Sequence, residues 1–161
     1  MLDAIAWAEG TAHHPNNGYG IVAHGLVIRA PGHPELVGTV GTPNNPTTII
    51  DFSGHPNTLV RFRQRRPRNT SAAGRYQFLR RTWEGLGLPD FSPENQDIGA
   101  VMLLQQEGAI EPLLEGNVEQ AAFNARRQWA SLPRSPHGQP TRRMSDFQRT
   151  YDDALARCLD R

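Results

Sequence analysis

The sequence changes character near residue 70, and this change limits the folds that the chain can adopt. Before residue 70, short β-branched segments alternate with glycine, proline and asparagine clusters, which favours a small antiparallel sheet with many turns. After it, apolar residues recur at spacings of three and four, which predicts amphipathic helices. We therefore expect an α+β fold, in which a small antiparallel sheet near the N-terminus joins a mostly helical domain. With no internal repeat or linker in sight, residues 1–161 are expected to form a single domain.

Local signals give the expected elements. Strands are expected over 20–29, 36–40 and 47–52, and a helical turn over 56–62. A helix is expected over 73–86, with an apolar stripe made of Tyr76, Leu79 and Trp83. A second begins after the N-cap Ser92, with the stripe Ile98, Val101 and Met102. Capping-box pairs predict two more helices, at Asn117 with Gln120 (stripe Val118, Ala121, Ala122, Ala125 and Trp129) and at Ser145 with Gln148 (stripe from Phe147 to Cys158).

One acidic side chain lies at the end of a predicted N-terminal helix. Leu2, Ile5 and Ala6 precede Glu9 by seven, four and three positions, so a helix places all of them on one stripe. Gly10 predicts the C-terminal end of this helix. A carboxyl group beside an apolar stripe is poorly solvated, which raises its pKa and suits a general acid near neutral pH. A solvated surface glutamate is the alternative that this segment alone leaves open.

Charge and composition argue against several classes of partner. The net charge is +1, and all 17 basic residues are arginine, so the balance does not favour a polyanion partner. The basic run 61–68 contains an aromatic residue, a combination found in nucleic-acid-binding segments, but Pro67 and the balanced charge favour a solvated loop. No signal peptide is expected, and the apolar runs are too short to span a bilayer, so no stable membrane association is expected. The single Cys158 excludes an intrachain disulfide and suggests a small core residue.

The sequence offers few alternatives for catalytic chemistry. It contains no nucleophile elbow, phosphate-binding loop, dinucleotide fingerprint or paired cysteines, and His13 and His14 lack partners at ligand spacing. We therefore expect neither a metal nor another cofactor. Between Glu9 and Glu35 there is no acidic residue. Because glycosidases normally use two carboxylates, an enzyme with one well-placed acid needs another nucleophile, such as a hydroxyl group of the substrate.

Six segments, in order along almost the whole chain, resemble the phage lambda type of endolysin, a lytic transglycosylase with a lysozyme-like fold. They are residues 6–11 (Ala-Trp-Ala-Glu-Gly-Thr), 18–19 (Gly-Tyr), 51–56 (Asp-Phe-Ser-Gly-His-Pro), 71–77 (Ser-Ala-Ala-Gly-Arg-Tyr-Gln), 88–97 (Leu-Pro-Asp-Phe-Ser-Pro-Glu-Asn-Gln-Asp) and 129–133 (Trp-Ala-Ser-Leu-Pro). The resemblance implies cleavage of the bond between N-acetylmuramic acid and N-acetylglucosamine in peptidoglycan, with a 1,6-anhydro-muramyl product and no use of water. Glu9 would be the single catalytic acid/base.

The resemblance also implies a glycan groove and a setting for the reaction. Substrate-binding residues would be Tyr19, Arg75, Tyr76, Gln77, Ser131, His137 and Gln139. For Tyr76 a core position is as good an interpretation as a ligand contact, and Trp7 and Trp129 are expected in the core. The family implies a monomer that is made in the host cytoplasm and reaches periplasmic peptidoglycan through a holin pore.

Two departures from the family pattern concern this groove. Gly20 replaces an acid after the Gly-Tyr pair, and residues 136–139 read Pro-His-Gly-Gln where a Gly-Tyr-Gly-Gln loop is expected. Three alternatives stay open at this point. They are a hydrolytic muramidase with Asp51 as a second carboxylate, an inactive peptidoglycan-binding or structural phage component, and, most weakly, a nucleic-acid module on the basic run.

Overall fold

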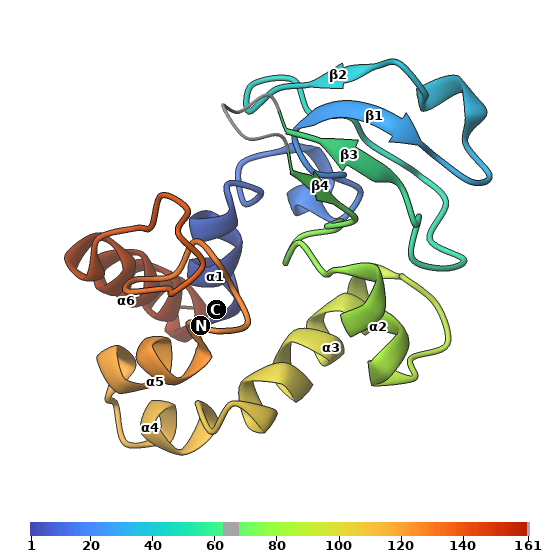
Figure 1. The fold of residues 1–161 in the computed structure, drawn as a ribbon. Coiled ribbons are helices and arrows are strands. Elements are labelled where there is room, and N and C mark those ends of the chain that lie inside the picture. Colours follow the sequence, from blue (N-terminus) through green and yellow to red (C-terminus); the bar gives the residue numbers. More distant parts are fainter. Residues whose placement is uncertain (63–67, 161) are drawn as a thin grey trace. The chain divides into compact units, whose positions relative to one another are not determined.

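The computed structural model describes residues 1–62 and 68–160, which group into two compact units (Figure 1). The helical unit comprises Met1–Ala12 and Ala100–Arg161, and the sheet unit comprises His13–Gly99. Most of the basic run at 61–68 lies outside the described residues, so the nucleic-acid alternative gains no structural account. No helix within the described ranges combines the length and the apolar character needed to cross a membrane.

The helical unit is built around α1, and α6 packs against it. Its elements are α1 (Leu2–Glu9), the second half of α3 (Pro93–Gln106), α4 (Ile110–Leu114), α5 (Val118–Ala125) and α6 (Met144–Leu159). Small residues of α1, Ala4 and Ala8 among them, are buried together with Phe147 of α6. Alanines at a helix contact let two helices approach closely, and this packing fixes the helix that carries Glu9.

The capping signals of the helical unit are confirmed in part. Asn117 accepts a hydrogen bond from the Gln120 backbone N–H at 3.0 Å, but the Gln120 side chain bonds Asn124 instead of closing a capping box. The pair at Ser145 was a wrong prediction, because α6 already begins at Met144 and has no side-chain cap. The predicted buried stripe of α5 is confirmed from Val118 to Ala125, while Trp129 is buried beyond the helix end.

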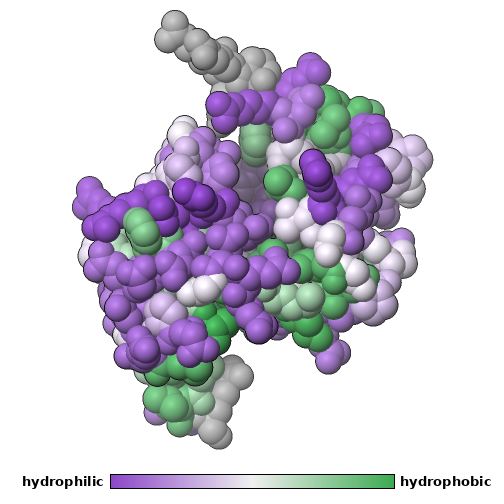
Figure 2. Space-filling view, turned by 60° about the horizontal axis from the view of Figure 1, so that its bottom comes forward, coloured by the Kyte–Doolittle hydropathy of each residue, from purple (hydrophilic) through white to green (hydrophobic). Residues whose placement is uncertain are grey.

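Two helix faces differ from the predicted ones. The prediction that Cys158 is a core residue is wrong, because this cysteine is exposed near the end of α6. On α3, Ile98 and Val101 are 42% and 43% exposed, and the smaller Gly99 and Ala100 are buried in their place. Gly99 is close-packed, since a Cβ there would lie 3.0 Å from the Trp83 ring. Figure 2 shows hydrophobic side chains grouped in patches on an otherwise mostly hydrophilic face.

The sheet unit contains four short antiparallel strands in the order β2-β1-β3-β4. Its elements are the 3₁₀ turns η1 (Pro15–Gly18) and η2 (Pro34–Leu36), the strands β1 (Gly25–Arg29), β2 (Val40–Gly41), β3 (Leu59–Arg61) and β4 (Asn69–Thr70), the helix α2 (Arg80–Leu86), and the start of α3. The register pairs Leu26 with both Val40 and Arg61 and shifts between Val27 and Arg29. The small antiparallel sheet is therefore present, as the sequence predicts.

Individual strand boundaries were predicted poorly. The segment 56–62, expected as a helical turn, supplies strand β3. The expected strand 36–40 contains the end of η2 and the start of β2, and the expected strand 47–52 contains a single bridge from Thr48 to Ile21. Gly20 has a structural reason within this region. Its carbonyl accepts the Ile49 N–H at 2.8 Å, and a Cβ at position 20 would clash with the Ile49 carbonyl oxygen. This close approach accounts for the glycine at a position where the family pattern has an acid.

The helix predicted over 73–86 begins only at Arg80. Before it, Gly74 (φ 78°) and Gln77 (φ 49°) adopt left-handed backbone conformations, and Ala73 pairs with Phe78 across the resulting turn. A helix cannot continue through such residues. The side-chain spacing that suggested a helix instead reflects an aromatic core, in which Phe78 and Phe91 pack edge-on against Trp83 with ring centroids 4.9 and 4.7 Å away. Leu79, expected in the stripe, is 48% exposed.

Candidate active site

Glu9 is the last residue of α1, in the position that the sequence predicts. Gly10 ends the helix in the left-handed conformation (φ 79°), and the Thr11 hydroxyl donates to the Ala6 carbonyl at 3.0 Å. This buried hydrogen bond and the backbone bond from Thr11 N–H to the same carbonyl close the helix end. The Glu-Gly-Thr sequence therefore fixes the carboxylate at a rigid helix terminus and not on a loop.

The Glu9 carboxyl group is partly buried and bound by a serine far along the chain. Ser131 Oγ donates a hydrogen bond to Glu9 Oε1 at 2.5 Å. Burial raises the pKa of Glu9 to about 7, against smaller opposing effects of the Ser131 hydrogen bond and the Arg142 charge. A carboxyl group with such a pKa is partly protonated near neutral pH, so it can both give and accept a proton.

In the sheet unit, two predicted site residues bind one aspartate. The hydroxyl groups of Tyr19 and Tyr76 both donate to Asp97 Oδ1, at 2.8 and 2.6 Å. Burial and the Asp97 hydrogen bond raise the pKa of Tyr19 to about 12 and that of Tyr76 further. Both phenols therefore stay protonated donors across the physiological range. Tyr76 is 1% exposed, so the core position that the sequence left open for it is the one observed.

Arg75 and Gln96 complete this cluster. The Arg75 guanidinium lies over the Tyr19 and Tyr76 rings, 5.4 and 5.8 Å from their centroids, and donates to the Asn17 carbonyl at 2.5 Å. The buried Gln96 amide accepts from the Arg75 N–H at 2.9 Å and donates to the Tyr19 and Phe91 carbonyls. These bonds hold the turn that carries residues 74–77 against α3.

Gly74 allows this arrangement. Its φ is 78°, and a Cβ there would clash with the Gln96 side-chain amide and the Phe91 ring. The glycine of the Ala-Gly-Arg-Tyr-Gln segment thus permits close packing inside the sheet unit.

The remaining predicted site residues lie on turns. Gln77 Nε2 donates to the Gly74 carbonyl at 3.0 Å, within its own turn. His137 is exposed and its Nε2 lies 2.7 Å from the Arg127 carbonyl, while Gln139 is exposed two residues later. Asp51, the second acid of the muramidase alternative, is exposed, and the Ser53 backbone N–H at 2.8 Å lowers its pKa.

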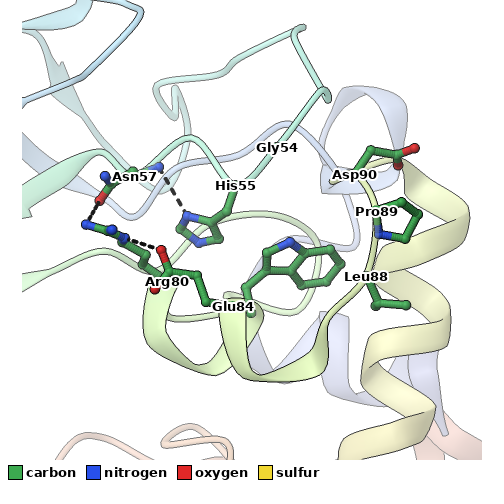
Figure 3. Close-up of a pocket in the computed structure, with 9 residues that line it drawn as sticks. Gly54, His55, Asn57, Arg80, Glu84, Leu88, Pro89 and Asp90 are labelled. Carbon is green, nitrogen blue, oxygen red and sulfur yellow. Dashed lines mark hydrogen bonds and ion pairs between the residues drawn. The ribbon is translucent and has the colours of Figure 1, made fainter.

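A pocket of about 270 Å³ opens beside α2 in the sheet unit (Figure 3). Its polar groups bond one another: Asn57 N–H donates to His55 Nδ1 at 3.1 Å, and Arg80 binds both Glu84 and Asn57. His55 Nε2 lies 2.9 Å from the Phe78 carbonyl, so this ring is used within the fold. The side chains of His55, Arg80 and Glu84 are therefore engaged in contacts within the fold. Within the described residues no three side chains of metal-binding type come together.

Sequence analysis missed two groups of this site. Asp97 lies within the segment 88–97 that carries the resemblance, so its position in that segment was the available signal. Arg142, which contacts the end of α1, lies 134 residues from its partner Ala8, and no local pattern marks it. Ser131 was predicted as a substrate contact, and the structure brings it onto the Glu9 carboxylate.

Comparison with solved structures defines the class of fold. The structure of bacteriophage lambda lysozyme complexed with a chitohexasaccharide matches with a TM-score of 0.74 and 30% identity, covering 95% of this chain and 90% of that one. A second structure of lysozyme from bacteriophage lambda matches with a TM-score of 0.64 and 29% identity, covering 96% and 86% of the two chains. The fold is therefore the lysozyme-like α+β fold that the sequence predicts.

Sequence comparison then defines the family. The endolysin family model matches residues 1–158. The chain is 36% identical over 149 residues to the endolysin of Escherichia phage P2, covering 86% of this chain and 81% of that one. It is 32% identical over 165 residues to the endolysin of Escherichia phage lambda, covering 98% and 85%. The chain belongs to the endolysin family of peptidoglycan-cleaving phage lysis enzymes, which confirms the predicted family.

Proposed function

We propose that this endolysin is a lytic transglycosylase in which Glu9 is the single catalytic acid/base. The observation that carries the proposal is a partly buried carboxyl group at a helix end, held by a neutral hydroxyl group and titrating at about 7. A retaining or inverting hydrolase places two carboxylates about 5–10 Å apart. In this structure, burial, Ser131 and Arg142 act on the Glu9 carboxyl group, and the charge that contributes is positive.

The reaction proceeds in two proton transfers through one carboxyl group. Protonated Glu9 donates its proton to the glycosidic oxygen between N-acetylmuramic acid and N-acetylglucosamine, and the C1–O bond breaks. The resulting Glu9 carboxylate takes the proton from the C6 hydroxyl group of the muramic acid as that oxygen bonds to C1. The enzyme returns to its protonated state, and the product is the 1,6-anhydro sugar without addition of water.

The other predicted site residues have supporting roles in this proposal. Ser131 orients the carboxylate of Glu9, and the exposed His137 and Gln139 offer hydrogen bonds to the glycan from their loop. In the sheet unit, Tyr76 acts through the Asp97 network rather than by touching sugar, because it is buried. The polar groups proposed to bind the glycan in this unit are those of Tyr19 and of the turn residues Arg75 and Gln77.

We extend the proposal to the setting of the reaction. The chain acts as a monomeric single domain on periplasmic glycan strands, after synthesis in the host cytoplasm and release through a holin. The matched structure of bacteriophage lambda lysozyme is complexed with a chitohexasaccharide, which supports a glycan of β-linked amino sugars as the substrate class.

Mass spectrometry of digested peptidoglycan tests the reaction type. We expect muropeptides that end in 1,6-anhydro-muramic acid and lack the oxygen of solvent water when the digest is run in ¹⁸O-water. Reducing ends labelled with ¹⁸O would overturn the transglycosylase proposal in favour of a hydrolytic muramidase. Binding to the wall without soluble product would instead support an inactive structural component.

A further inference from the structure

Arg142 binds the helix end at which Glu9 stands, from a segment just before α6. Its Nε donates to the Ala8 carbonyl at 3.2 Å and its Nη2 to the Trp7 carbonyl at 3.4 Å. The last carbonyl groups of an α-helix lack partners within the helix, and an arginine is well suited to satisfy two of them at once. The guanidinium is therefore a side-chain cap on the C-terminus of α1.

Two further contacts fix Arg142 in this position. Its guanidinium lies over the Trp7 ring, 4.8 Å from the centroid, as in a cation–π pair. Its backbone N–H donates to the Ser131 carbonyl at 2.9 Å. Ser131 also donates its hydroxyl group to Glu9. The segment from Ser131 to Arg142 therefore binds both the Glu9 carboxyl group and the end of the helix that carries it.

The charge of Arg142 opposes an unfavourable pair of negative charges. The C-terminus of a helix carries a partial negative charge, and Glu9 adds a carboxylate there, while the last turn of α1 contains no basic residue. On the packed element α6, Arg157 lies 4.0 Å from Asp3 at the other end of α1. Among the described residues, Ser131 and Arg142 are the side chains that lower the pKa of Glu9.

We propose that Arg142 is a positioning residue for Glu9, which caps the C-terminal carbonyls of α1, packs on Trp7 and stabilises the carboxylate form of the acid/base. This inference rests on the proposed role of Glu9. It predicts that loss of the Arg142 charge makes Glu9 a weaker acid and a stronger base. Proton donation to the glycosidic oxygen then becomes harder, and proton removal from the C6 hydroxyl group becomes easier.

Three variants separate the charge of Arg142 from its packing. Arg142→Gln removes the charge, Arg142→Lys keeps the charge but loses the planar fork, and Arg143→Gln changes the exposed neighbour as a matched control. We measure the Glu9 pKa directly by ¹³C NMR of labelled glutamate carboxyl groups, with Glu9→Gln to assign the signal. The pH dependence of peptidoglycan cleavage is measured on the same proteins.

We expect the Glu9 pKa in Arg142→Gln to be higher than in the parent protein by about 0.5 or more, because a nearby opposite charge is lost. Cleavage should then retain activity to higher pH, with a lower maximum. Arg142→Lys should keep the Glu9 pKa within about 0.3 pH of the parent protein but lower the Tm, since a single ammonium group replaces the two-carbonyl cap. Arg143→Gln should change none of these quantities.

An unchanged Glu9 pKa in Arg142→Gln, or an equal rise in Arg143→Gln, would overturn the proposal. If Arg142→Gln does not fold, a Glu9 pKa in Arg142→Lys more than 0.5 pH above the parent value would also overturn it. The NMR titration does not depend on the reaction type. Failure of the transglycosylase proposal would appear in the digest products and leave this titration unchanged.

Discussion

Two carboxylates in this molecule accept hydrogen bonds from side-chain hydroxyl groups, with opposite consequences. In the sheet unit, Asp97 receives two phenols, of Tyr19 and Tyr76, whose own pKa values are raised so that they stay protonated. In the helical unit, Glu9 receives one serine hydroxyl, and burial, which outweighs the lowering effect of that hydrogen bond, raises the pKa of Glu9 to about 7. The first arrangement locks its protons in place, whereas the second leaves the carboxyl group able to gain and lose one.

The comparison shows that the surroundings of a carboxyl group separate a structural role from a catalytic one. Asp97 accepts both phenol groups, and the Arg75 guanidinium lies over the rings of the same two tyrosines, so loss of this carboxylate would leave two hydroxyl groups without their acceptor. Glu9 is desolvated by its surroundings but bound by few groups, so its protonation state is easily changed. Catalytic function is therefore expected from Glu9 and fold stability from Asp97.

The largest expected effect comes from Glu9→Gln, which keeps the shape of the side chain and removes its proton chemistry. Peptidoglycan cleavage should fall at least about 10³-fold, within the range of general acid–base catalysis. Turbidity loss of purified cell walls measures it, with the exposed Glu111→Gln as the matched control. A variant that retains a tenth of the activity would remove Glu9 from its proposed role.

The same variant should show how pH acts on stability. Since folding raises the Glu9 pKa from 4.5 to about 7, the native state binds this proton more tightly, and the carboxylate destabilises the fold as pH rises through that window. Glu9→Gln should therefore have a higher Tm than the parent protein at pH 8 and little difference at pH 4. Scanning calorimetry at both values checks the sign, which an equal difference at the two pH values would contradict.

The next largest effect should fall on stability and not on the chemical step. Asp97→Ala leaves the phenol groups of the buried Tyr76 and the half-buried Tyr19 without their acceptor and should cost about 2–4 kcal/mol of unfolding free energy. Asp97→Asn keeps one acceptor and should recover part of the loss. Urea unfolding measures both variants. A loss of cleavage in Asp97→Ala with unchanged stability would show that this cluster acts in the reaction itself.

The smallest expected effect is a shift of the pH profile in Ser131→Ala. The hydroxyl group stabilises the Glu9 carboxylate, so its loss should raise the Glu9 pKa and move the alkaline fall of cleavage to higher pH, with a loss of activity within about 10-fold. Ser135→Ala is the matched control, because its buried hydroxyl group has no hydrogen-bond partner among the residues that the structure describes. A profile in Ser131→Ala that overlays the control would contradict the orienting role.

Local sequence determined the parts of this protein whose causes are local. The stripe before Glu9 and the glycine after it predicted α1 and its C-terminal end, and the Ser92-Pro93 pair and Asn117 predicted the starts of α3 and α5. Capping and helix termination involve residues within about four positions, so they can be read from the chain directly. The same stripe suggested a poorly solvated Glu9 but left a solvated surface position open, and the structure decides between them.

Tertiary structure decided what depends on distant partners. The helix expected over 73–86 lost its first turns because Gly74 and Gln77 adopt positive φ values, and at Gly74 the side chains of Gln96 and Phe91 pack too closely for a Cβ. Three-residue strands such as β3 carry too little pattern to be recognised without their neighbours. Predictions from residue spacing were therefore least accurate in segments whose conformation depends on distant partners.

The acid of this site was decided by the sequence, and its environment by the fold. Glu9 is bound by Ser131, 122 residues away, and its helix is capped by Arg142, 134 residues from Ala8. No local sequence pattern predicts such pairs, because closing a loop of more than about 100 residues costs entropy and the contact forms only when the intervening residues have packed. The local sequence thus singles out Glu9 as the proposed proton donor, whereas its pKa is a property of the folded chain.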